Sequence, residues 1–332
     1  MEAELGVPTE LQILEDSQME SISEPEITLN ALSRDLAHVI EQVSPSVVAV
    51  NARRHLSSSG VYWRDGIIVT AAHTIRRTDD ISIILTSGRT VAADLAGVDP
   101  STDLALLKID NAELSPPLFG DTPQIKVGHL ILAIGRGAQK GLNATLGIVG
   151  VLSGSWRTWR GGLIDQYIGL DLVLHPGAAG GPLTDSRGRV LGINSLGLSR
   201  NMALTIPVST VNRVVTRLLE KGHMSMGYLG LGMRPMPLPE NLKSALNLSG
   251  DSGLIVVSVE PEGPGDKAGV LFGDVIVALE GKAVSNIHDL QAFLEPESVG
   301  KRVPVSIIRG GKTIEVNITI GARRQKITET SE

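Results

Sequence analysis

Three segments of the chain carry the parts that nucleophilic acyl transfer requires. His73 ends the apolar segment 68–73, which places an imidazole at a strand end as a candidate general base. Asp103 stands directly before the apolar run 104–107, so its carboxylate could orient that base. The glycine-rich turn 176–182 could point consecutive N–H groups at one developing negative charge. Together these segments predict an acyl-transfer site.

The nucleophile itself is missing from this turn. Residues 175–183 read HPGAAGGPL, with alanine at position 179 where a serine nucleophile is expected. A methyl group cannot attack a carbonyl, so no acyl-enzyme can form at Ala179. Either the serine was exchanged to trap an inactive form, or it was lost naturally, and the sequence leaves both open. A third alternative is that Thr184 or Ser155 supplies the hydroxyl, although a working site tolerates displacements of only about half an ångström.

Composition predicts a β-rich protein with two domains. A length of 332 residues exceeds what one hydrophobic core usually supports, and only 3% of the residues are aromatic, so Val, Ile, Leu and Ala must build the cores. The formal net charge of −6 argues against nucleic-acid binding, which needs clustered Lys and Arg. The chain has no cysteine and its 7 histidines lack metal-ligand spacing. We therefore expect no disulfide, no metal and no other cofactor.

Hydrophobic spacing predicts the elements that position the candidate residues. A helix over residues 30–43 precedes a series of short strands between residues 47 and 193, and a second helix covers residues 208–219. Residues 233–239, with three prolines, break the strand pattern. A helix around 286–294 and two final strands follow. The expected domains are an acidic, disordered tail over 1–29, a first domain over 30–222, a second over 227–321 and a polar tail over 322–332.

The order His, Asp, glycine-rich turn is the chymotrypsin-type order, and the wider sequence resembles one family of that type. Residues from about 43 to 222 resemble the trypsin-like protease domain of the HtrA/Deg family, through segments 65–73, 97–109, 176–183, 188–194 and 203–207. Residues 227–321 resemble its PDZ domain, through segments 227–231, 264–269 and 273–276. The resemblance implies a mainly β fold: a chymotrypsin-like double β-barrel protease domain followed by an α+β PDZ domain.

The resemblance also implies roles for residues of the first domain. His73 would be the general base, Asp103 its orienting carboxylate, and the N–H groups of Gly177 and Ala179 the oxyanion hole. A pocket for small or medium apolar side chains would be formed by Val173, Asn194, Ser195 and Leu196. The chain departs from the family at His175 and Ala178, where asparagines are common, at residues 62–64, and at 135–137, which read Gly-Arg-Gly.

In the PDZ-like domain, the resemblance implies a site for peptide C-termini. The N–H groups of Leu229, Gly230 and Leu231 would bind a terminal carboxylate while the peptide adds as a strand. Leu290 and Leu294 would form an apolar pocket, with ordinary helix packing as the alternative.

The functional expectation is an HtrA-like serine endopeptidase scaffold for unfolded or exposed polypeptides, inactive as written because of Ala179. The alternative is a natural pseudoprotease that serves as a peptide-binding or chaperone-like scaffold. Because residues 28–61 lack the aromatics through which the family forms trimers, we do not expect that trimer, and another homo-oligomer stays open. No export signal and no apolar run of about 20 residues is visible, which predicts a cytoplasmic protein without a membrane span, with the periplasm as the family alternative.

Overall fold

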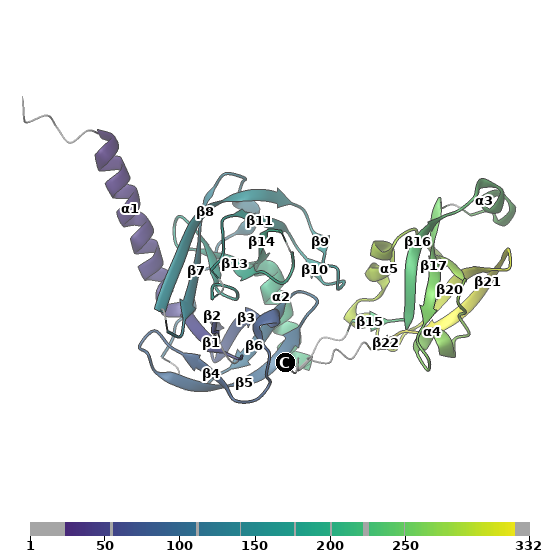
Figure 1. Ribbon diagram of the computed structural model, residues 1–332, viewed down its shortest axis with the longest axis horizontal. Coiled ribbons are helices and arrows are strands. Elements are labelled where there is room, and N and C mark those ends of the chain that lie inside the picture. The colour runs from purple at the N-terminus through teal and green to yellow at the C-terminus, as the bar shows by residue number, and fades with distance from the viewer. Residues whose placement is uncertain are drawn as a thin grey trace, which may run out of the picture.

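The computed structural model describes residues 24–53, 56–110, 113–139, 141–175, 177–199, 201–221, 226–248 and 250–322. The acidic tail lies largely outside these residues, and so does the polar tail after Ala322. The first helix, α1 (Glu24–Val43), begins earlier than the predicted residue 30, because Pro25 suits a first helical turn and the apolar spacing continues upstream through Leu29. Figure 1 shows α1 projecting from the first domain, against which only its C-terminal end packs.

Residues 47–108 form a closed antiparallel barrel. Its strand order is β1-β2-β3-β6-β5-β4. The strands are β1 (Val47–Asn51), β2 (Ser58–Arg64), β3 (Ile67–Ala71), β4 (Ile81–Ile84), β5 (Thr90–Asp99) and β6 (Leu104–Lys108). Aliphatic side chains such as Ile68, Ile83 and Leu107 fill this barrel and are fully buried, as the aromatic-poor composition predicts.

A second closed barrel follows, with the order β11-β14-β13-β12-β7-β8. Its strands are β7 (Leu130–Gly137), β8 (Gly141–Ser153), β11 (Tyr167–Asp171), β12 (Pro182–Asp185), β13 (Val190–Ser195) and β14 (Ala203–Pro207). The short strands β9 (Trp156–Arg157) and β10 (Leu163–Ile164) form a separate hairpin, and α2 (Val208–Lys221) closes the domain. One core cluster joins side chains of both barrels, α1 and α2, so the barrels form a single unit.

The remaining residues form a smaller mixed domain. Its sheet has the order β16-β17-β18-β20-β21, with β19 paired to β18, and β15 pairs separately with β22. The strands are β15 (Gly227–Tyr228), β16 (Leu231–Pro237), β17 (Ser252–Val259), β18 (Val275–Leu279), β19 (Lys282–Ala283), β20 (Arg302–Arg309), β21 (Lys312–Thr319) and β22 (Gly321–Ala322). The helices are α3 (Glu240–Leu246), α4 (Pro264–Lys267) and α5 (Ile287–Phe293).

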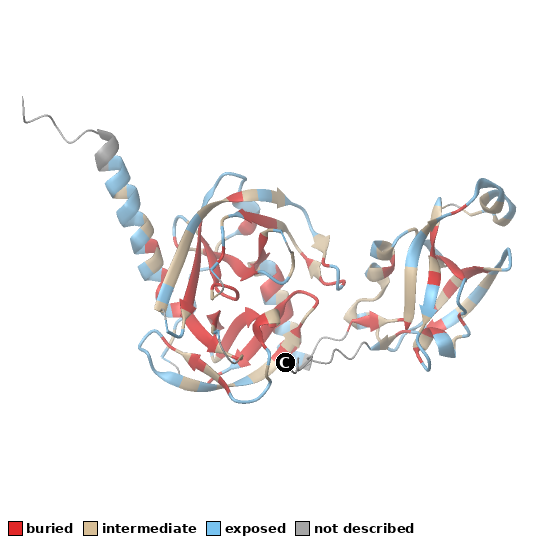
Figure 2. Ribbon diagram, in the orientation of Figure 1, coloured by how far each residue is buried: buried red, intermediate tan, exposed pale blue. Residues whose placement is uncertain are grey.

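The burial pattern in Figure 2 separates the cores of the two domains. The architecture confirms the predicted mainly β fold class of a double barrel followed by an α+β domain. One element contradicts the sequence analysis: residues 233–237, interpreted as a break, belong to strand β16. Because β16 is an edge strand, its prolines remove no hydrogen bond that the sheet needs.

Candidate functional site

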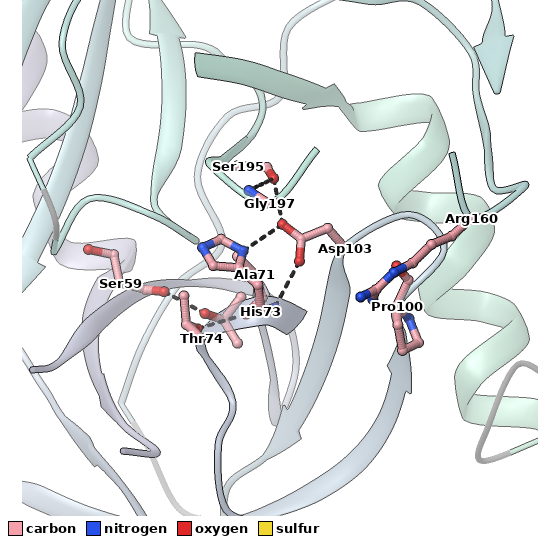
Figure 3. Close-up of polar contacts among 10 residues, drawn as sticks. Ser59, Ala71, His73, Thr74, Pro100, Asp103, Arg160, Ser195 and Gly197 are labelled. Carbon is pink, nitrogen blue, oxygen red and sulfur yellow. Dashed lines mark hydrogen bonds and ion pairs between the residues drawn. The ribbon is translucent and has the colours of Figure 1, made fainter. Parts of the chain in front are cut away.

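His73 and Asp103 are brought together by two paired strands. His73 lies in the 3-10 turn Ala72–Thr74 that follows β3, and Asp103 lies directly before β6. These strands pair in register, with Ala71 opposite Leu104. His73 Nδ1 lies 2.7 Å from Asp103 Oδ2, and the His73 backbone N–H donates to Oδ1 at 2.8 Å (Figure 3). A carboxylate oxygen only accepts, so Nδ1 carries the proton and Nε2 is left as the ring's base.

Further contacts hold the Asp103 carboxylate in place. Asp103 is buried and adopts a left-handed backbone conformation with φ of 61°. Ser195 Oγ donates to Asp103 Oδ2 at 2.5 Å and accepts from the Gly197 N–H at 3.0 Å. A Cβ at Gly197 would lie 2.8 Å from both Asp103 Oδ2 and His73 Nδ1, so only glycine fits beside the pair. The pair is therefore fixed from both barrels.

The glycine-rich turn is anchored by its carbonyl groups. Ser59 binds two of these carbonyls. The Ser59 N–H donates to the Ala179 carbonyl at 3.0 Å, and Ser59 Oγ donates to the Gly177 carbonyl at 2.6 Å. Gly180 has φ of 83°, and a Cβ there would collide with the Ser59 carbonyl. Among the described residues, the N–H groups of Gly177 and Ala179 donate to no protein acceptor. That arrangement suits an oxyanion hole, and the role stays a prediction.

The side chain at the nucleophile position is buried, with Ala179 only 1% exposed. Neither alternative hydroxyl reaches the imidazole within the part of the chain that the structure describes. Thr184 is buried in β12 and donates to the Leu132 carbonyl at 3.4 Å, while Ser155 is exposed between β8 and β9. The hydroxyl that does join the site, Ser195, bonds to the carboxylate and not to the histidine.

The predicted substrate pocket is only half assembled. Val173 and Leu196 line an open groove of about 950 Å³, together with residues that include Leu170 and Met202. Asn194 does not line it: the side chain is fully buried, donating to the Pro182 carbonyl at 2.9 Å and accepting from Thr205 at 3.0 Å. Ser195, whose hydroxyl is turned to Asp103, does not line it either. Neither Asn194 nor Ser195 faces this groove, and the role of the four predicted residues as a substrate pocket stays a prediction.

The residues predicted to bind a peptide C-terminus lie at the start of β16 and beside α5. Gly230 has φ of 72°, which lets the chain turn sharply between Leu229 and Leu231. Leu231 and Leu294 are half-buried, whereas Leu229 and Leu290 are each 2% exposed and belong to the domain core. Core packing, the alternative considered for Leu290, therefore describes its place in this structure.

One residue of the site was missed by the sequence analysis, although its unusual segment 135–137 was noticed. The Arg136 N–H donates to Ser59 Oγ at 2.8 Å, on the same serine that holds the glycine-rich turn. Its guanidinium, buried against the end of α1, donates to the Val47 carbonyl at 2.7 Å and to Ser44 Oγ at 2.8 Å. Burial lowers the pKa of Arg136.

The described residues contain no group of three His, Asp or Glu side chains placed to hold a metal ion. None of their helices is long and apolar enough to cross a membrane.

Comparison with known proteins places both domains. Residues 58–193 match the family described as a trypsin-like peptidase domain, and residues 227–320 match the PDZ domain family. The chain is 34% identical over 272 residues to a probable periplasmic serine endoprotease, DegP-like, of Brucella suis, which covers 80% of this chain and 52% of that protein. A protein of the same name from Halomonas elongata is 31% identical over 274 residues, covering 81% of this chain and 57% of that protein. The chain thus spans about half the length of these curated relatives.

Solved structures give the same picture. The HtrA-type protease AlgW with a decapeptide is 26% identical, with a TM-score of 0.68, and the match covers 87% of this chain and 99% of that one. The serine endoprotease from Yersinia pestis is 27% identical, with a TM-score of 0.68, and the match covers 86% of this chain and 97% of that one.

Proposed function

Because the chain belongs to the HtrA/DegP family of trypsin-like proteases and carries one PDZ domain, we propose that it binds extended polypeptide segments without cleaving them. One observation carries this proposal: position 179 holds a methyl group in an otherwise assembled site. The His73 ring has no hydroxyl to deprotonate at that position. The unpaired N–H groups of the turn and the neighbouring groove remain available to an extended chain.

The intact His73–Asp103 pair favours a second candidate, an endopeptidase scaffold that lacks only its serine. Both residues, Ser195 and the anchored turn keep a geometry that peptide binding alone does not require. In this candidate His73 would take the proton of a serine at position 179, and the N–H groups of Gly177 and Ala179 would receive the oxyanion.

Proteolysis of casein by the chain and its Ala179→Ser variant separates the candidates. We expect the unchanged chain to cleave no faster than its His73→Ala variant. The second candidate predicts that Ala179→Ser gains at least about a thousandfold in cleavage rate, because removing the nucleophile of a working triad costs roughly 10⁶ in kcat. The double variant with His73→Ala is the matched control for that gain. His73-dependent cleavage by the unchanged chain would refute the proposal, whereas an inert Ala179→Ser variant would leave binding as the only role of this domain.

The PDZ domain is the second binding site in the proposal. In the part of the chain that the structure describes, the N–H groups of Leu229, Gly230 and Leu231 have no backbone acceptor outside the strand ladders, and structural neighbours such as AlgW are named with bound peptides. We expect peptides with a free apolar C-terminus to bind more tightly than the same peptides with an amidated end. Equal affinities in a calorimetric titration would exclude carboxylate capture.

The names of the relatives support a compartment outside the cytoplasm. They are named periplasmic, which fits the family alternative and not the predicted cytoplasm. We therefore place the chain outside the cytoplasm, and fractionation of the native cells tests that placement.

A further inference from the structure

The open edge of strand β16 determines how far along the PDZ domain a bound peptide can pair, which the proposed function does not specify. β16 stands at one end of the sheet, with β17 as its sheet partner, and α5 lies beside it (Figure 1). Half-buried apolar side chains from both elements lie there, among them Leu231, Met233 and Ile287. An extended peptide could therefore add to this edge as a further strand.

Hydrogen bonds of the neighbouring strand show which residues of β16 face the open edge. Val256, which stands opposite Met233, uses its N–H and its carbonyl on the far side, toward Asp274 and Gly273. At the start of the strand, the Gly230 carbonyl accepts from the Glu260 N–H. Alternate residues of a strand point their backbone groups to opposite neighbours. Even-numbered residues of β16 therefore face β17, and odd-numbered residues face the open edge.

Only two of the four odd-numbered residues can donate along this edge. Leu231 and Met233 have a backbone N–H, whereas Pro235 and Pro237 have none. The irregularity between Gly232 and Met233 does not change this alternation, because the extra residue, Val257, is on β17. Beyond Met233 the edge therefore offers carbonyl acceptors without the matching donors.

We propose that this edge reads only the last three residues of a peptide C-terminus. With the carboxylate at the N–H groups of residues 229–231, the terminal peptide residue lies beside Leu231, and the third residue from the end exchanges both hydrogen bonds with Met233. The fifth from the end meets Pro235 and loses one of its two bonds. The ligand class is a short C-terminal sequence with an apolar last residue, whose upstream residues add little affinity. This proposal rests on the carboxylate capture described above.

A peptide length series measured on the full chain tests the proposal. The probes are peptides with a free N-terminus, so that the four-residue peptide has no carbonyl opposite residue 235. They share the same three apolar C-terminal residues and are extended upstream by alanines to a length of four, five, six and seven. Calorimetry or fluorescence anisotropy gives each dissociation constant. We expect less than a threefold change in affinity between four and seven residues.

A second test is a proline-to-alanine exchange that should increase the affinity for the longer peptides. Pro235→Ala restores one donor at the open edge, so peptides of five or more residues should bind about two- to tenfold more tightly, while the four-residue peptide is unchanged. Pro239→Ala is the matched control, because Pro239 lies outside β16 as the N-cap residue of α3. A variant that merely disturbed the domain would change affinity for the shortest peptide as well.

The outcomes separate this proposal from the one on which it rests. If free and amidated peptides bind equally or not at all, carboxylate capture fails and the proposal falls with it. If free C-termini are preferred but affinity rises more than fivefold from four to seven residues, and Pro235→Ala changes nothing, the prolines do not end the ladder. Preference for free C-termini, a flat length series and a length-dependent gain in Pro235→Ala together support it.

Discussion

At the scale of the residue, Arg136 is as unusual as the missing nucleophile. Its side chain is 8% exposed, and among the described residues no carboxylate pairs with it. Its partners are backbone and hydroxyl oxygens at the end of α1 and the start of β1, where the last carbonyls of a helix carry partial negative charge. Through its backbone N–H and Ser59, the same residue reaches the turn that contains Ala179. Arg136 thus joins α1 to the candidate site.

Replacing Arg136 by methionine should destabilise the protein. The exchange keeps the length of the side chain but leaves the buried oxygens of Val47 and Ser44 without donors, at a cost of about 1–3 kcal/mol for an unpaired buried group. We expect a loss of about 2 kcal/mol in urea unfolding and fraying of α1 in far-UV circular dichroism. Arg136→Lys, which keeps the charge, is the control and should lose less. If Arg136→Met has the same urea midpoint as the parent, the free-energy cost of burying the Arg136 charge equals the stabilisation from its hydrogen bonds.

Contacts between individual site residues were predictable where two directly paired strands bring the residues together. His73 and Asp103 flank β3 and β6, which pair directly, so their motifs were enough to predict the contact. Ser195 could not be predicted as the partner of Asp103, because Ser195 lies in the second barrel and Asp103 in the first. Arg136 could not be predicted either, since its partners come from residues 44–59, far away in sequence.

At the scale of the element, the turn between β5 and β6 sets the position of Asp103. Asp99 ends β5, and its buried carboxyl accepts from the Ser101 N–H at 2.9 Å, from Ser101 Oγ at 2.5 Å and from Thr102 Oγ1 at 2.6 Å. Burial raises the pKa of Asp99 above its usual value, and the bonds from Ser101 and Thr102 offset only part of that shift. The turn therefore holds its shape through a carboxyl that resists ionisation.

The raised pKa of Asp99 predicts a pH-dependent effect of Asp99→Asn. With a folded-state pKa above the unfolded one, the contribution of Asp99 to stability is full below an unfolded pKa of about 3.9 and is lost as the pH rises through the folded value. Asparagine stays neutral at every pH. In urea unfolding, Asp99→Asn should lose the most free energy of unfolding relative to the parent near pH 4. This loss should shrink toward pH 7. Asp94→Asn, exposed on the same strand, serves as control; a pH-independent difference for Asp99→Asn would contradict the assignment.

The elements themselves were predictable where apolar spacing was regular. Short Val- and Ile-rich runs separated by Gly and Asp turns predicted the strands, whereas their closure into two barrels was implied by the family resemblance. The helix expected around 286–294 is α5. Strand β16 was interpreted as a break, because proline is excluded from central strands and the sequence does not show that this strand is at the edge. The local sequence pattern predicted strands, whereas only the pairing of strands in the structure showed which of them is an edge strand.

At the scale of the whole molecule, the two domains meet through a small polar contact. Arg157 of β9 pairs with Glu295 after α5 at 2.6 Å, and Arg217 of α2 pairs with Glu297 at 3.1 Å. The side chain of Met226 lies against Gly161 in the β9–β10 hairpin. This hairpin also packs on the turn before Asp103, because Thr158 Oγ1 donates to the Ser101 carbonyl at 2.7 Å. The contact therefore joins the PDZ domain to the element that positions the candidate catalytic carboxylate.

Glu295→Gln should loosen the arrangement of the domains without unfolding either one. Arg157 is 12% exposed and Glu295 38% exposed, so the pair is partly screened by water and contributes no more than about 1 kcal/mol. A contact that small shifts the balance between docked and undocked domains by about fivefold. We expect a larger radius of gyration in solution scattering for Glu295→Gln, and a smaller expansion of the parent at 1 M salt, because salt screens a partly buried pair in direct contact less than it screens exposed charges. Glu262→Gln removes a carboxylate that lies 4.0 Å from Lys267 within the PDZ domain and should leave the radius unchanged. If Glu295→Gln and the parent scatter identically at low salt, apolar contacts such as that of Met226 hold the domains together, and the two ion pairs do not.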